Sequence, residues 1–186
     1  MRSVSGRQEG DKRPMNAAIV VREAVSGDYE ALCEIIDQVD ELHRNKLPSR
    51  FKAAEGPVRS KAYIVNAISA AEIGLFVAET EHERSLLSFV HVMIRDTPGI
   101  PIFVPRRYAV VDSLAVRREH QRSGVGRALM ERALAWAMAK GAESMELRVY
   151  AFNGPAMRFY ERLGYRILSH HMTKWLDAPE GTRSDQ

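Results

Sequence analysis

The stretch that most constrains the fold is residues 110–134, VVDSLAVRREHQRSGVGRALMERAL. An apolar, β-rich run meets a polar turn containing Gly124 and Gly126, and a helical pattern begins directly afterwards. This junction predicts an anion-binding turn, because small residues let the backbone approach a phosphate and the unpaired N–H groups of the first helical turn point at it. The partial positive charge at the helix N-terminus adds to the attraction.

Two common phosphate-binding motifs fit this turn poorly. A Walker-type P-loop requires Gly-x-x-x-x-Gly-Lys-Ser/Thr, and the turn has no such lysine. A dinucleotide-binding fingerprint requires Gly-x-Gly-x-x-Gly or Ala immediately after its strand. Here Leu129 occupies the third small-residue position, and eight polar-rich residues separate Val116 from Val125.

Hydrophobic periodicity and turn residues predict an α/β (α+β) fold with a central mixed sheet, in the order βααβββαβαβ. Ser26 is expected to cap the first helix, Pro57 to lie in the first turn of the second, and Gly141 to end the third. The three prolines within residues 96–107 predict a long loop. Strands are expected at residues 17–25, 74–80, 86–94, 108–116, 145–150 and 165–175, and helices at 28–43, 57–72, 124–140 and 153–163.

Length and composition predict one soluble domain. The chain has 186 residues, and 45% of them are hydrophobic, which suffices for a full core. We expect a domain at residues 15–176 with flexible tails at 1–14 and 177–186, and Met1 and Met15 are alternative starts.

Charge and cysteine usage limit the partners. The formal net charge is +3, and the N-terminal tail supplies most of it. The rest of the chain shows no basic stripe of the kind that would indicate a nucleic-acid partner. A single cysteine, Cys33, and no apolar run of membrane length predict a cytoplasmic protein without a membrane span. No metal is expected, since His170 and His171 are adjacent in a predicted strand and would point to opposite faces.

The polar turn resembles a motif of the GNAT superfamily of N-acetyltransferases, which use acetyl-CoA. Gln121, Gly124 and Gly126 match the family's Gln/Arg-x-x-Gly-x-Gly/Ala pattern. The stretch from Asn153 to Tyr165, NGPAMRFYERLGY, is similar to the family's Asn-x-x-Ala-x-x-x-Tyr-x-x-x-Gly-Phe block and departs only in its last aromatic. The resemblance spans roughly residues 17–175 and implies the GNAT fold.

The resemblance also implies where acetyl-CoA binds. The pantetheine arm is expected between the strand of residues 111–116 and the strand of residues 147–149, paired with the backbone of Leu114 and Val116. The diphosphate is expected on the N–H groups of residues 122–127. The coenzyme-binding residues implied in this way are Leu114, Ala115, Val116, Gln121, Arg122, Ser123, Gly124, Val125, Gly126, Arg127, Asn153, Ala156 and Tyr160.

Four residues are candidates for a part in the chemistry. Tyr160 matches the family's tyrosine and would act as the general acid that protonates the leaving thiolate. A backbone N–H near Leu114, freed by a β-bulge, would polarise the thioester carbonyl. Asp112 is the first candidate for the base that deprotonates the amine, and His91 is the second. Each has a structural alternative: a packed tyrosine, an unbroken ladder, a paired carboxylate and a structural histidine.

The function implied by the resemblance is transfer of an acetyl group from acetyl-CoA to the primary amine of a small molecule. Two alternatives remain open: acetylation of a protein lysine or N-terminus, and a non-catalytic CoA-binding module. Residues 41–61 and 96–107 are expected to select the acceptor. Basic side chains in the first segment favour either an acidic acceptor or a solvated face. Homodimers are common among similar proteins, so a homodimer is compatible with this reading.

Overall fold

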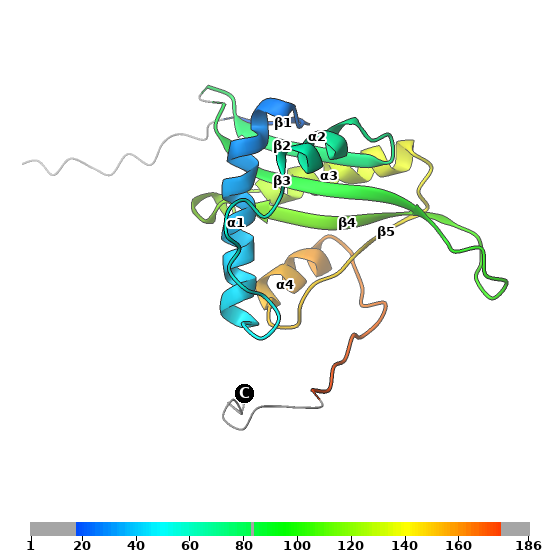
Figure 1. Cartoon of the computed structure of the whole chain (residues 1–186). Coiled ribbons are helices and arrows are strands. Elements are labelled where there is room, and N and C mark those ends of the chain that lie inside the picture. The colour runs from blue at the N-terminus through cyan, green and yellow to red at the C-terminus, as the bar shows by residue number, and fades with distance from the viewer. Residues whose placement is uncertain (1–17, 83, 176–186) are drawn as a thin grey trace, which may run out of the picture. The chain divides into compact units, whose positions relative to one another are not determined.

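A five-stranded mixed sheet organises the part of the chain that ends at Arg148 (Figure 1). The first three pairings are antiparallel, and the last, between β4 and β5, is parallel. The strands lie side by side in sequence order: β1 (Ile19–Glu23), β2 (Ile73–Thr80), β3 (Leu86–Asp96), β4 (Arg107–Val116) and β5 (Ser144–Leu147). This mixed sheet with its helices confirms the predicted fold class.

The computed structural model describes residues 18–82 and 84–175. Its contacts define two units, one up to Arg148 and one from Val149 onward. The predicted tails at residues 1–14 and 177–186 lie outside the described residues, as does the start of the strand predicted at 17–25. The predicted extent of the domain, residues 15–176, stays a prediction.

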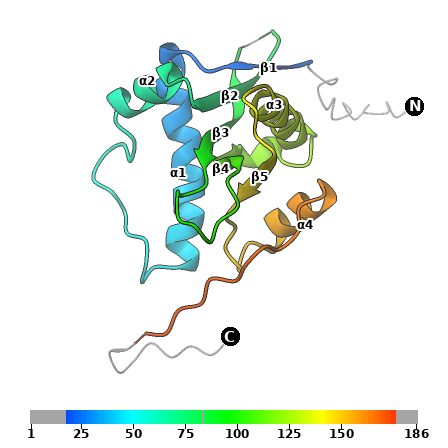
Figure 2. The same ribbon diagram turned by 90° about the vertical axis from the view of Figure 1, so that its right-hand side faces the viewer.

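Helices cover both faces of the sheet (Figure 2). α1 (Tyr29–Lys46) and α2 (Lys61–Ser69) pack on one face, where the core cluster includes Leu32, Ile35, Ile64, Leu75, Val77, Phe89 and Ala115. α3 (Val125–Ala139) packs on the other face. The fit there is close, because a Cβ on Gly74 would lie only 2.7 Å from Phe76 and 3.1 Å from Trp136.

The unit that begins at Val149 contains α4 (Gly154–Arg162), as predicted. The side-chain oxygen of Asn153 accepts a hydrogen bond from the N–H of Ala156 at 3.2 Å and so caps the helix. Gly164 follows the helix with φ +89°, a conformation that glycine adopts without strain.

The strand predicted at residues 165–175 is wrong for the described structure, in which these residues form no strand. A strand requires a neighbour that shares its backbone hydrogen bonds, and no strand pairing in the described residues includes this segment. Its apolar side chains are exposed, with Leu168 at 77% and Met172 at 89%. The observed order therefore ends at α4.

Two predicted helix starts also need correction. Ser26–Asp28 forms a 3-10 turn, so Asp28 and not Ser26 is the residue that precedes α1. α2 begins four residues after Pro57, because the hydroxyl of Ser60 accepts a hydrogen bond from the N–H of Tyr63 at 3.2 Å and caps the helix there. β5 ends at Leu147, earlier than predicted.

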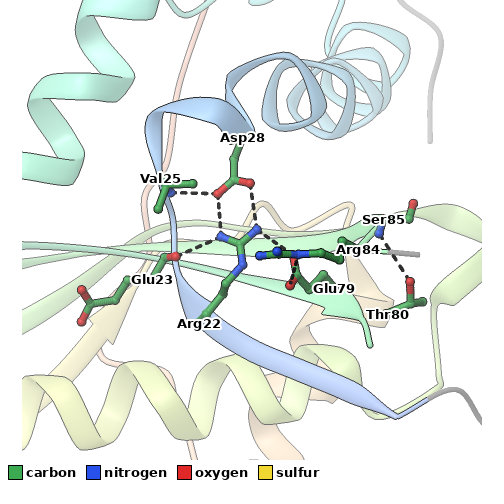
Figure 3. A network of polar contacts seen from close by, with 8 residues as sticks. All are labelled: Arg22, Glu23, Val25, Asp28, Glu79, Thr80, Arg84 and Ser85. Carbon is green, nitrogen blue, oxygen red and sulfur yellow. Dashed lines mark hydrogen bonds and ion pairs between the residues drawn. The ribbon is translucent and has the colours of Figure 1, made fainter. Parts of the chain in front are cut away.

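Arg22 joins three segments of the first unit through a buried ionic network (Figure 3). Its guanidinium donates to Asp28 at 2.7 and 2.9 Å and to Glu79 at 2.6 Å. Both carboxylates are buried. Burial alone would raise the pKa of Asp28, but hydrogen bonds from Arg22 and the N–H of Val25 outweigh it and lower that pKa. The hydrogen bond from Arg22 likewise lowers the pKa of Glu79 against the opposing effect of burial.

We predict that Arg22→Met destabilises the fold by about 2–3 kcal/mol, because it leaves two buried carboxylates without their main partner. This loss of stability is smaller than that expected from breaking a fully buried ion pair, because Arg84 still contacts Glu79 and the N–H of Val25 still contacts Asp28. The matched control is Arg118→Met, which removes an exposed ion pair with Glu41 and is expected to cost less than about 1 kcal/mol. Urea unfolding of both variants measures the difference, and equal losses would contradict the network's role.

The same network predicts an acid-sensitive contribution to stability. The pKa values of Asp28 and Glu79 are lower in the folded state than in the unfolded state. The stability that the two carboxylates provide is therefore complete above their unfolded pKa values of about 4, and it is lost as the pH falls from there through the lower folded values. The stability gap between wild type and Arg22→Met is therefore expected to narrow between about pH 5 and pH 3. A gap that stays constant over this range would contradict the assignment.

Candidate active site

β4 contains a bulge at Asp112. Val111 pairs with Val92 and Ser113 pairs with His91, so Asp112 is an extra residue without its own partner on β3. Strict alternation would place Asp112 on the same face as Leu114 and Val116, and the bulge breaks that alternation. The carboxylate instead lies beside its neighbours on β3 and β4, at 3.1 Å from Nδ1 of His91 and 3.4 Å from the hydroxyl of Ser113.

His91 and Asp112 form a pair with one buried and one exposed member. The side chain of His91 is 8% exposed and that of Asp112 is 44% exposed. The hydrogen bond from His91 lowers the pKa of Asp112 against the effect of burial, and the charge of Arg59 lowers it further. The Nε2 atom of His91 is buried and has no hydrogen-bond partner among the described residues. The two predicted candidates for the base therefore belong to one site, where Asp112 is the accessible group.

Beyond the bulge, β4 has a free edge. Its pairing with β5 covers only Tyr108–Val111, whereas its pairing with β3 continues to Val116. The N–H of Arg117 donates to the carbonyl of Leu87 at 2.8 Å. By the alternation of an antiparallel ladder, the N–H and C=O groups of Leu114 and Val116 then point away from β3, toward the free edge. These are the backbone groups predicted to pair with the pantetheine arm.

The turn between β4 and α3 presents unpaired backbone donors. The N–H groups of residues 122–126 donate to no backbone carbonyl among the described residues, and those of Arg127 and Ala128 both reach the carbonyl of Gly124. Arg122 and Gly124 have positive φ values of 64° and 91°, and backbone of this kind turns successive N–H groups toward one anion. The space where a Cβ of Gly124 would lie is open. This geometry suits the diphosphate of the predicted coenzyme.

Tyr160, Asn153 and Ala156 lie in the second unit. Tyr160 packs edge-on against Phe159 and Tyr165, with ring centroids 5.2 and 5.7 Å away. Burial raises the pKa of Tyr160 to about 12, so its hydroxyl stays protonated at neutral pH, as an acid requires. The side-chain oxygen of Asn153 already serves as the cap of α4, which gives this residue a structural role beside the predicted one.

A residue that the sequence analysis did not single out lines a cavity of about 290 Å³ in the first unit. Arg59 contributes to this cavity together with residues 56–58 and three residues of α1. Cys33, the single cysteine, is partly buried and lines the same cavity. Nothing in the local sequence distinguishes Arg59 from the other basic residues of this segment, because its setting depends on α1.

Within the described ranges, no helix combines the length and apolarity needed to cross a membrane. The same ranges contain no cluster of three or more histidine, cysteine or acidic side chains able to hold a metal ion.

The sequence matches the family model described as the acetyltransferase (GNAT) family over residues 36–165, which is more than half of the chain. The chain therefore belongs to the GNAT family of acetyltransferases. It is an acyltransferase of the N-acetyltransferase type, and its family uses acetyl-CoA as co-substrate.

Individual relatives agree with this membership. An N-alpha-acetyltransferase of Sulfurisphaera tokodaii is 26% identical over 149 residues, which cover 77% of this chain and 83% of the relative. The crystal structure of a tetramutant of the BH1408 protein from Bacillus halodurans has a TM-score of 0.79 at 26% identity and covers 84% of this chain and 99% of that chain. A glucosamine-6-phosphate N-acetyltransferase of Arabidopsis thaliana, 14% identical with a TM-score of 0.62 over 86% of this chain and 99% of that one, shares the fold.

We predict that Gly124→Glu abolishes acetyl-CoA binding, because it places a side chain and a negative charge in the open space beside the unpaired N–H groups. Gly141→Glu is the matched control. Gly141 also has a positive φ, of 79°, but it follows the opposite end of α3, so the backbone strain is similar and the charge is remote from the turn. Isothermal calorimetry measures the affinity, and unchanged binding by Gly124→Glu would refute the diphosphate assignment.

Proposed function

We propose that the chain transfers the acetyl group of acetyl-CoA to the primary amine of a small molecule in the cytoplasm. The observation that supports this most directly is the free edge of β4 at Leu114 and Val116, which leads into the unpaired N–H groups before α3. A strand edge offers hydrogen bonds to the amides of pantetheine, and the turn offers donors to the diphosphate.

In the proposed reaction, the neutral amine attacks the thioester carbonyl directly. The N–H of Leu114 stabilises the negative charge that develops on the carbonyl oxygen. The C–S bond then breaks and the thiolate leaves, while the attacking nitrogen gives its extra proton to water, so that the new C–N bond belongs to a neutral amide. Tyr160 donates its phenolic hydrogen to the sulfur. Because burial raises its pKa to about 12, above the ordinary thiol value of about 8.5, the phenol keeps its hydrogen until negative charge develops on the sulfur. Water then returns a proton to the phenolate after the transfer.

Asp112 is the proposed group that receives the acceptor. An alkylamine is mostly an ammonium ion at neutral pH, and the exposed carboxylate of Asp112 attracts this cation. Its lowered pKa keeps it ionised and makes it a weak proton acceptor, so the proton of the ammonium leaves to water while Asp112 holds the nitrogen. His91 fixes the carboxylate at 3.1 Å and acts as a positioning residue.

A second candidate function is acetylation of a protein N-terminus or lysine. The observation that favours it is the 26% identity to the N-alpha-acetyltransferase of Sulfurisphaera tokodaii. An α-amino group of a peptide and the amine of a small molecule present the same ammonium to Asp112, so the acceptor's remaining contacts distinguish the two functions.

The first experiment follows thermal unfolding of the protein with acetyl-CoA. A ligand at about 100 times its dissociation constant stabilises the folded state by roughly 2.7 kcal/mol. We expect a clear rise in Tm, and a smaller rise with dephospho-CoA or pantetheine. No rise at millimolar acetyl-CoA would refute the coenzyme site. Binding without turnover of small amines or peptides would favour a non-catalytic CoA-binding module.

We predict that Tyr160→Phe lowers kcat by about a hundredfold, since loss of a general acid typically costs that much, and leaves the affinity for acetyl-CoA nearly unchanged. Tyr165→Phe is the matched control, because its ring packs against Tyr160 and burial likewise raises its pKa to about 12. Release of CoA in steady state, measured with a thiol reagent, separates the variants. Equal kcat values for the two would contradict the role of Tyr160.

A further inference from the structure

The cavity beside α1 has a mixed lining. Cys33, Ile36 and Asp37 line it from α1, and residues 56–59 line it from the connection to α2. Its volume of about 290 Å³ lies just below the usual range for small-molecule sites, about 300–1,000 Å³. A small metabolite therefore fits it better than a folded partner.

The cavity lies on the same face of the sheet as the bulge of β4. Ile36 packs against the core cluster that contains Leu75 and Phe89. Leu75 pairs with His91 across β2 and β3, and paired residues in a sheet project from the same face. His91 in turn holds Asp112. The cavity and the pair of His91 and Asp112 therefore lie on the same face of the sheet, the one that α1 and α2 cover.

Arg59 is held in place by its backbone. Its carbonyl accepts a hydrogen bond from the hydroxyl of Tyr29 at 3.0 Å and lies 4.0 Å from the sulfur of Cys33. Its guanidinium forms no ion pair or hydrogen bond with any residue that the structure describes, although the side chain is partly buried. Its positive charge reaches Asp112, whose pKa it lowers.

Three of the five carboxylates of α1 are engaged by other arginines, and none of the five pairs with Arg59 among the described residues. Asp37 in the cavity pairs with Arg44 at 3.3 Å, and Glu34 pairs with Arg117 at 2.6 Å. Glu41 pairs with Arg118. A partly buried guanidinium that lacks a partner is costly unless an anion binds it, and a carboxylate or phosphate matches its fork of donors.

We propose that the acyl acceptor is an amine that also bears an anionic group, a carboxylate or a phosphate. Arg59 binds the anionic group, Asp112 holds the ammonium, and the apolar part of the acceptor lies against Ile36 and Val58. This inference rests on the proposed function, because it assigns the cavity to the acceptor of the acetyl group. The distance between the charges of Arg59 and Asp112 decides whether an α-amino acid, an ω-amino acid or an amino phosphate is the best acceptor.

The test measures binding of matched amines to the complex with CoA, so it does not require turnover. Each pair differs in the anionic group: leucine and isopentylamine, 4-aminobutyrate and propylamine, and O-phosphoethanolamine and ethanolamine. In wild type we expect the anionic member of at least one pair to bind at least about tenfold more tightly than its partner. This is the gain in affinity that one charge-assisted hydrogen bond provides. The pair that shows the preference identifies carboxylate or phosphate as the anion.

Variants assign the preference to Arg59. Arg59→Gln is expected to remove it, and Arg59→Lys to restore part of it, since lysine keeps the charge and loses the fork of donors. The matched control is Arg50→Gln, an exposed arginine on the same connection that is outside the cavity lining. It is expected to keep the wild-type preference.

Three results would overturn the proposal: equal affinity within every pair, no binding of any pair, or a preference that survives Arg59→Gln. Acetyl-CoA titration of the same variants separates this failure from that of the proposed function. Normal coenzyme binding with no anionic preference refutes only the acceptor assignment. Loss of coenzyme binding in wild type refutes the proposed function itself.

Discussion

The site depends on a strand that continues after one of its neighbours has ended. Backbone N–H and C=O groups are obligatory hydrogen-bonding groups, and a strand satisfies them from both sides only while both neighbours remain. β4 has β3 on one side as far as Val116 but β5 on the other only as far as Val111. The backbone groups of Leu114 and Val116 on this side give an extended ligand an edge to bind, although the carbonyl of Val116 also accepts a hydrogen bond from the side chain of Gln121 at 3.5 Å. The turn into α3 follows directly.

α1 fixes the position of that turn. Glu34 and Glu41 of α1 pair with Arg117 and Arg118, which follow the last residue of β4. Arg117 also donates to the carbonyl of Leu86 at 2.8 Å and so ties the same point to β3. The helix that borders the cavity is therefore connected to the segment that leads into the turn before α3. A change in the position of α1 would affect both.

Sequence patterns predicted the parts of the fold that depend on local signals. Strands such as β4, the glycine turn and the helix α4 each depend on signals within a few residues of the chain, and they were predicted correctly. The segment 165–175 shows the limit of such signals, because a strand-like pattern does not supply a hydrogen-bonding partner. Ser60 and Pro57 show another limit: both are plausible helix starts, and the cap formed by Ser60 decided between them.

The main features of the candidate site were harder to predict, since they depend on pairing between distant segments. His91 and Asp112 were separate candidates for the base, and only the register of β3 against β4 shows that they are in contact. Arg59 differs from its basic neighbours because it lines the cavity beside α1, where the carboxylate of Asp37 is paired with Arg44. The residues proposed to bind the coenzyme could be inferred from a local motif, whereas those proposed to bind the acceptor are brought together by tertiary structure.

The bulge makes β4 one residue longer than its ladder with β3 requires. Arg107–Val116 contains ten residues, and the β3 residues paired with it, Ser88–Asp96, number nine. Removing Asp112 would join Val111 to Ser113, and each would keep its present partner on β3. The sheet thus gains no pairing from Asp112, and a regular ladder without it would be complete. The extra residue of the strand is also its only carboxylate. The length of β4 at this point is therefore explained by the side chain that the bulge presents and not by the pairing of the sheet.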